Sequence, residues 1–243
     1  MTAPRGFVEA VERARRATDC GQLALLREEI ETRPWAGAAR HQIRHAEEWA
    51  GCHQDSVATL VFSGHMIDAP GRTNARFPPE AEPSVNTRLT AAIAAEHRAR
   101  PVGLAVAGAA SGGDILFLEA AQQLGIVTRI LLPGPPDEFA ARSVAPAGRD
   151  WLARFEAVCS RSPPAILHDH LELPEWLAST VDYSVWERNN RWILATAVEA
   201  GGETTTLIAL WDGQQGDGRG GTAHMVDQAL ARGLNVVTID PRA

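Results

Sequence analysis

The chain contains 243 residues, of which 45% are hydrophobic and 22% are charged. This length and composition suit one large α/β domain, with or without a small appendage, and exclude a disordered chain. The net charge of −7 excludes a general grip on the phosphates of nucleic acids. A small anionic ligand needs only one or two local arginines and stays compatible with this charge.

Two features bear on where the protein resides. No stretch approaches the length of about 18 uninterrupted apolar residues that a membrane span needs, and the N-terminus lacks the apolar core of a signal peptide. The cysteines Cys20, Cys52 and Cys159 are widely spaced and odd in number, which is typical of a reducing compartment. We therefore expect a cytoplasmic protein without stable membrane association.

The first part of the chain carries helical patterns only. Apolar residues recur at helical spacing in residues 6–19 and 21–33, and a third helix is expected over residues 35–51. No second copy appears at a fixed period, which favours a small helical unit packed on the main domain, or the relic of a repeat array, over a complete array. We assign residues 1–55 to an N-terminal helical extension.

From residue 56 onward, strand and helix patterns alternate. Predicted strands, several of them near-continuous apolar runs, cover residues 56–63, 102–108, 127–133, 165–169, 204–212 and 234–240. Helical patterns lie between them at residues 78–99, 112–125, 148–160, 181–200 and 221–233. This alternation predicts an α/β fold with a Rossmann-like, doubly wound, mainly parallel sheet over residues 56–243. Such sheets bind ligands beyond the carboxyl ends of their strands, near a topological switch point.

The junction after the first strand is unusually long. Ser63 and Gly64 end the strand, and a long loop follows that carries three further candidate ligand-binding residues, His65, Arg72 and Arg76. Loops of this length inside a compact α/β unit are often functional or disordered. The two arginines can close over an anion, or they can be ordinary surface residues.

The junction after the second strand is rich in small residues. Gly108, Ser111, Gly112 and Gly113 precede a helix that begins near Asp114. Small residues let the backbone approach a ligand, and free amides at a helix N-terminus favour an anion. Asp114 occupies the place of such an anion, so it either caps the helix or meets a ribose hydroxyl. Tight packing without a ligand explains the same pattern.

The third junction follows the fifth predicted strand. Gly218, Gly220 and Gly221 precede Thr222, whose hydroxyl can cap the helix or contact a phosphate. His224 lies in the first helical turn, where the helix dipole keeps an imidazole neutral. Three such junctions favour a ligand site more strongly than one does, because a parallel sheet brings the loops after its strands together at one edge.

The helix before this strand adds polar and aromatic side chains. At helical spacing, Trp186 and Asn190 share one face, as do Tyr183 and Glu187. The same predicted helix carries Arg188 and Arg191. An aromatic ring with Arg and Asn can hold a base and a phosphate. A half-buried amphipathic helix is the equally weighted alternative.

Other motifs are weak or missing. His41 and His45 lie four residues apart without the glutamate of an HExxH site, and His168 and His170 flank Asp169 at the end of a predicted strand. The chain has no GxSxG elbow and no GxxxxGK[ST] loop. We expect neither a metal nor a cofactor, and the motifs do not support a hydrolase triad or nucleoside triphosphatase chemistry.

Four segments, in this order, resemble the SLOG superfamily, which joins the LOG phosphoribohydrolases, the DNA-processing protein A fold and nucleotide-sensing domains. They are LVFSGHMID, GAASGGDILFLEAAQQLG, ALWDG and GGTAHMVDQALARGLNVV. Similar segments also occur beside class III nucleotide cyclase and tetratricopeptide modules in bacterial signalling proteins. The resemblance covers residues 56–240. It implies that the ligand's phosphates and ribose lie near Ser63, Gly64, Gly108, Gly112, Gly113, Gly221 and Thr222.

One departure from the LOG pattern bears on activity. LOG enzymes carry a PGGxGTxxE loop whose glutamate acts on the glycosidic bond, whereas the corresponding residue here is Met225. A methionine cannot handle a proton. An enzyme would need another carboxylate, for which Glu119, Glu187 and Asp227 are the candidates.

We therefore expect a module that binds or senses a nucleotide or nucleotide-derived signal, such as ADP-ribose, NAD or a cyclic nucleotide, in bacterial signalling or defence. The first alternative is a hydrolase of nucleotide N-glycosidic bonds. The second is a protein-interaction domain with a vestigial pocket. Because SLOG relatives often pair or assemble, a protein partner or a homo-oligomer is compatible with the resemblance.

Overall fold

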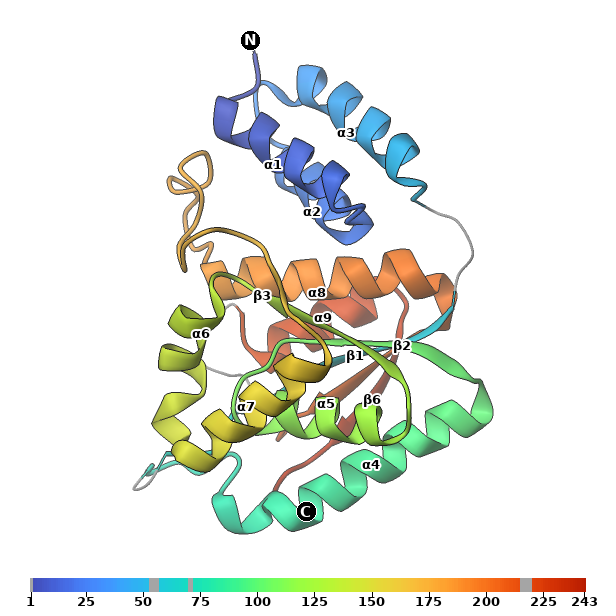
Figure 1. The fold of residues 1–243 in the computed structure, drawn as a ribbon, viewed down its shortest axis with the longest axis vertical. Coiled ribbons are helices and arrows are strands. Elements are labelled where there is room, and N and C mark those ends of the chain that lie inside the picture. Colours follow the sequence, from blue (N-terminus) through green and yellow to red (C-terminus); the bar gives the residue numbers. More distant parts are fainter. Residues whose placement is uncertain (1, 53–56, 70–71, 215–219) are drawn as a thin grey trace.

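The computed structural model describes residues 2–52, 57–69, 72–214 and 220–243. Within them, a six-stranded sheet has the order β4-β3-β2-β1-β5-β6, and all neighbouring strands run parallel (Figure 1). The strands are β1 (Ala58–Gly64), β2 (Val102–Ala107), β3 (Val127–Leu132), β4 (Ala165–Ile166), β5 (Thr205–Leu210) and β6 (Asn235–Ile239). The chain builds β2, β3 and β4 outward from β1, and then crosses back to add β5 and β6 on its other side. The predicted doubly wound sheet is confirmed.

Helices cover both faces of the sheet (Figure 1). On one face lie α4 (Glu82–Ala99) and α5 (Gly113–Gln123), with α7 (Arg149–Arg161) against α5, and on the other lie α8 (Val185–Gly201) and α9 (Thr222–Ala231). The central strand β1 is buried on both sides, with Leu60 and Phe62 in the core under α5 and Val61 in the core under α8. Alternate side chains of a strand point to opposite faces, so a strand covered on both faces is a continuous apolar run.

The N-terminal helices form a separate layer outside α8 (Figure 1). They are α1 (Arg5–Arg16), α2 (Cys20–Glu29) and α3 (Ala36–Ala50). Helix α2 packs against α8, where Leu25 joins the same core cluster as Trp192. A buried ion pair also joins Glu29 to Arg188 at 2.8 Å. The helical extension is thus built onto the main domain. Its boundary at residue 55 stays a prediction and lies outside the described residues.

Two elements differ from the sequence prediction. The fourth strand is shorter than expected, because only Ala165–Ile166 pairs with β3 before the chain turns away. Helix α6 (Pro136–Ser143) was not predicted. Its proline at the first position and the acidic Asp137 and Glu138 in its first turn are helix-start signals, which the preceding prolines had obscured. Short 3₁₀ turns lie at Pro79–Ala81, Ala145–Ala147 and Gly202–Thr204.

The cysteines are not all unpaired. Cys20 at the start of α2 and Cys52 just after α3 form a disulfide, and Cys159 is free. The spacing argument missed this pair because the two residues meet only when α2 and α3 pack as an antiparallel hairpin. The cysteines therefore do not indicate a reducing compartment, and the cytoplasmic location stays a prediction. Among the described residues, no helix is long and apolar enough to cross a membrane.

Candidate functional site

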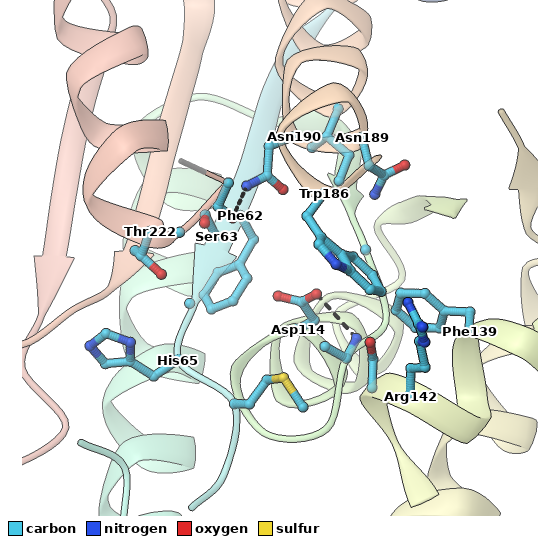
Figure 2. Close-up of a pocket in the computed structure, with 18 of the residues that line it drawn as sticks. Phe62, Ser63, His65, Asp114, Phe139, Arg142, Trp186, Asn189, Asn190 and Thr222 are labelled. Atoms are coloured by element: carbon cyan, nitrogen blue, oxygen red, sulfur yellow. Dashed lines mark hydrogen bonds between the residues drawn. The ribbon is translucent and has the colours of Figure 1, made fainter. Parts of the chain in front are cut away.

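A cavity of about 420 Å³ lies at the carboxyl ends of the strands, beside the point between β1 and β5 where the strand order reverses (Figure 2). Ligand sites of doubly wound sheets occur at this position. We call it the switch-point cavity. Its walls come from the end of β1, the loop before α5, and the first turns of α8 and α9, together with α6. The lining residues are Phe62, Ser63, Gly64, His65, Met66, Arg72, Arg76, Gly108, Ala110, Asp114, Phe139, Arg142, Ser143, Trp186, Asn189, Asn190, Ile193, Gly220, Gly221 and Thr222.

The N-terminus of α9 opens onto this cavity. Gly221 is the N-cap residue and Thr222 is the first helical residue, and no side chain among the described residues caps the helix. The preceding turn is held in place, since Asn190 donates from Nδ2 to the carbonyl of Gly220 at 2.7 Å. Gly220 has φ of +96°, and a Cβ there would lie 2.9 Å from the amide nitrogen of Glu187. Within the described residues, the first-turn amides of α9 therefore border the cavity in the arrangement that suits an anion.

The N-terminus of α5 is arranged differently. The amide of Gly113 donates to the carbonyl of His65 at 3.1 Å, and the amide of Ser111 donates to the carbonyl of Ser143 at 2.9 Å. Gly112 has φ of +96°, and a Cβ there would collide with the backbone of Ile67. Ser111, Gly112 and Gly113 do not line the cavity. Their small size allows the loop after β1 to pack against the start of α5.

Asp114 projects from the first turn of α5 into the cavity (Figure 2). Its Oδ2 accepts a hydrogen bond from the amide of Ala110 at 3.1 Å. Burial raises the pKa of Asp114 to about 7, and this hydrogen bond offsets only part of that effect. Gly108 makes room for the carboxyl group, because a Cβ there would lie 2.7 Å from Oδ2.

His65 and Asp212 form a buried pair at the end of the central strands. His65 Nε2 lies 3.2 Å from Asp212 Oδ1, and an Arg76 guanidinium nitrogen lies 3.5 Å from the same oxygen. Burial and the nearby Arg76 lower the pKa of His65, so the ring is neutral at pH 7. Arg72 lies 3.3 Å from Asp68. Both predicted arginines thus border the cavity while a carboxylate orients them. Asp212 lies two residues after the end of β5, and its position at a strand end was the signal that could have found it.

The opposite wall is aromatic. Trp186 of α8 and Phe139 of α6 have ring centroids 6.2 Å apart and tilted by 57°. Arg142 of α6 is exposed beside them and makes no ion pair with the described residues (Figure 2). Phe139 and Arg142 escaped the sequence prediction because α6 itself did. Asn189 lies three residues after Trp186, and helical spacing could have found it.

Several predicted residues lie outside the lining. Arg188 pairs with Glu29 of α2, so its role is to attach the N-terminal helices. His224 Nε2 lies 3.8 Å from Glu187 Oε1, and Glu187 is buried behind the turn at Gly220. Gly218 lies outside the described residues.

The three carboxylates expected to serve an enzyme do not line the cavity either. Glu119 is paired with Arg154 at 2.8 Å on the outer side of α5. Asp227 is exposed on α9, and Glu187 is buried as described above. Among the described residues there is no cluster of three or more His, Cys, Asp or Glu side chains that could hold a metal ion.

Comparisons with known proteins concern the fold. A scan against protein-family models gave no match, and a search of curated proteins gave none. Among solved structures, DNA processing protein A from Streptococcus pneumoniae is 13% identical, with a TM-score of 0.45, over 96% of this chain and 80% of that one. SuiB from Streptococcus suis, bound to S-adenosylmethionine, is 12% identical, with a TM-score of 0.27, over 83% of this chain and 44% of that one.

The fold expected from the SLOG resemblance is present. Its four quoted segments form β1, the start of α5, the end of β5 and the start of α9, and all four meet at the carboxyl edge of one parallel sheet. The chain therefore has a Rossmann-like α/β fold, and its membership of the SLOG superfamily stays a prediction.

Proposed function

We propose that this protein binds a nucleotide or a nucleotide-derived signal, of the ADP-ribose, NAD or cyclic-nucleotide type, in the switch-point cavity, and that it acts as a sensor in bacterial signalling or defence. The observation that carries the proposal is the N-terminus of α9, which no side chain of the described residues caps and which faces a cavity at the reversal of strand order. Backbone amides at such an end bind phosphate groups.

The remaining walls suit the rest of a nucleotide. Arg76 adds positive charge near the phosphate end, where Asp212 holds its guanidinium at 3.5 Å. Trp186 and Phe139 present an apolar aromatic wall on which a base can stack. A volume of about 420 Å³ lies within the usual range for pockets that hold small organic ligands.

Binding is favoured over turnover because the expected catalytic carboxylates lie elsewhere. Neither Glu119 nor Asp227 lines the cavity. Met225, which replaces the LOG glutamate, is a buried residue of α9. A hydrolase of N-glycosidic bonds remains the second candidate, because Asp114 is an acidic side chain on the lining with a pKa of about 7. Such a group can donate or accept a proton at neutral pH.

A thermal-shift panel of mononucleotides, NAD, ADP-ribose and cyclic nucleotides tests the proposal. A ligand at a hundred times its dissociation constant stabilises the fold by about 2.7 kcal/mol, which gives a clear rise in Tm. The same mixtures are then analysed by chromatography for free base. A shift without base supports a sensor. Base release that disappears in Asp114→Asn supports the hydrolase, and no shift with any compound favours the protein-interaction alternative.

The route from ligand to output belongs to the same proposal. A sensor acts through a protein partner or through self-association, and the resemblance allows for both. Size-exclusion chromatography of the protein with and without the stabilising compound tests self-association. An unchanged elution volume favours a separate protein partner.

A further inference from the structure

One lining residue does not fit a simple anion site. Asp114 is the one acidic side chain among the described residues of the switch-point cavity. The other charged side chains on its lining are Arg72, Arg76 and Arg142. A carboxylate in such a place repels a bound phosphate. Its position there is explained if the ligand carries a hydrogen-bond donor next to its phosphate.

The two carboxyl oxygens of Asp114 have different surroundings. Oδ2 accepts the amide proton of Ala110 at 3.1 Å, which fixes the orientation of the group. Oδ1 has no partner among the described residues, and it is not enclosed by protein. Gly108 permits this orientation, because a side chain there would meet Oδ2 at 2.7 Å. The fold therefore holds one oriented acceptor oxygen open to the cavity.

The place of this acceptor along the cavity narrows the choice of donor. Figure 2 shows the carboxyl group of Asp114 between the side that carries Thr222 and the side that carries Trp186 and Phe139. In a nucleotide whose phosphate meets α9 and whose base meets the aromatic wall, the group between them is the sugar. A ribose presents two neighbouring hydroxyls, and a hydroxyl that donates to a carboxylate forms a strong, charge-assisted hydrogen bond.

We propose that Asp114 is a specificity-determining residue that accepts hydrogen bonds from the ribose hydroxyls of the ligand, so that the protein selects ribonucleotides over 2′-deoxyribonucleotides. This inference rests on the proposed function and names the substrate class of the same site. It assigns the phosphate to α9 and the sugar to the start of α5.

Isothermal titration calorimetry at pH 8, where the Asp114 carboxyl group is mostly ionised, tests this selection with matched pairs of probes. AMP, GMP and CMP are each compared with their 2′-deoxy forms. Loss of a hydrogen bond to a charged group corresponds to a difference in affinity of about tenfold or more, so at least one ribose form should bind that much tighter than its deoxy form. In Asp114→Asn, ribonucleotide affinity should fall while deoxyribonucleotide affinity changes little, which narrows the preference.

Two further variants separate this role from a loss of folding. Asp150→Asn makes the same chemical change in the first turn of α7, where Asp150 is exposed and does not line the cavity, and its ribose preference should equal that of the wild type. Gly108→Ala displaces the carboxyl group without removing it and should also narrow the preference. The Tm of each variant confirms that it is folded.

The outcomes distinguish the two proposals. Equal binding of ribose and deoxyribose forms by the wild type overturns the inference and leaves the proposed function standing. If the preference for ribose over deoxyribose forms is unchanged in both Asp114→Asn and Gly108→Ala, the inference is likewise overturned and the proposed function still stands. If no nucleotide binds at all, the proposed function is overturned and the inference with it.

Discussion

Two helices of this protein begin with similar glycine-rich sequences and differ in what their N-termini do. At the start of α5, the amides of Ser111 and Gly113 donate hydrogen bonds to backbone carbonyls of the protein. The carboxyl group of Asp114, in the first turn of this helix, accepts a hydrogen bond from the amide of Ala110. At α9, which follows Gly220 and Gly221, none of the side chains that the structure describes caps the first turn. A glycine-rich helix start therefore becomes an anion site only where the neighbouring loops leave its amides unpaired.

The partners that occupy the α5 start come from distant parts of the chain. The acceptor carbonyls belong to His65, after β1, and Ser143, at the end of α6. An isolated antiparallel bridge between Met66 and Gly112 holds the same loops together. At α9, the preceding turn is instead held by Asn190 of α8, which donates a hydrogen bond to the carbonyl of Gly220. This contact does not involve the amides of the first helical turn.

The largest effect is expected from Gly112→Ala at the closed helix start. Gly112 has φ of +96°, and the new Cβ would collide with the Ile67 backbone, so both conformation and space oppose the change. We expect a loss of about 3 kcal/mol or more in the free energy of unfolding, measured by urea denaturation. Gly125→Ala is the matched control, since its φ is +75° with nothing within 4 Å, and it should lose only about 1 kcal/mol. Equal losses would contradict the packing role.

An intermediate effect is expected from Thr222→Asp at the open helix start. The new carboxylate would occupy the position of the ligand's phosphate, and its negative charge would interact favourably with the N-terminal end of the helix dipole. Affinity for the stabilising nucleotide should fall about tenfold to a hundredfold by calorimetry, while the Tm of the free protein stays the same or rises. Thr222→Ser keeps the hydroxyl and should bind as the wild type does. Unchanged affinity in Thr222→Asp would mean that the phosphate does not lie at α9.

The smallest effect concerns the pH dependence of stability through Asp114. Burial raises the pKa of this group from 3.8 to about 7, so between these values the folded state retains a proton that the unfolded chain has lost. Its contribution to the free energy of unfolding therefore falls as the pH rises through this window, and it is constant above the window. Asp114→Asn has no such group. The wild type should lose on the order of 1 kcal/mol relative to this variant between pH 6 and pH 7. If the difference in urea midpoint between the wild type and Asp114→Asn were the same at both pH values, the prediction would be contradicted.

The fold was largely predictable because its signals are local. The strand patterns come from burial on both faces, as Leu60, Val61 and Phe62 show in β1. Helix α6 was missed because prolines precede it, although its first-turn acids signal a helix. The disulfide between Cys20 and Cys52 was also missed, because only the packing of α2 on α3 brings the two residues together.

The candidate site was predictable in its position and less so in its members. Ser63, Gly108 and Thr222 do lie on one cavity, since parallel strands bring their carboxyl ends to one edge. Arg188 pairs with Glu29 of α2 and does not line the cavity. Helix α8 is buried on two sides, and the sequence pattern does not show which side a given residue faces. The lining residues of α6 were missed with their helix.

By itself, the sequence determined which segments become strands and helices, where the chain turns, and which turns carry glycine. These properties depend on backbone conformation and on apolar periodicity over a few residues. Only the tertiary structure decided which glycine-rich turn keeps its amides open and which carboxylate faces the cavity. Hydrogen-bond partners such as the carbonyls of His65 and Ser143 come from remote parts of the chain, and only folding brings them to the start of α5.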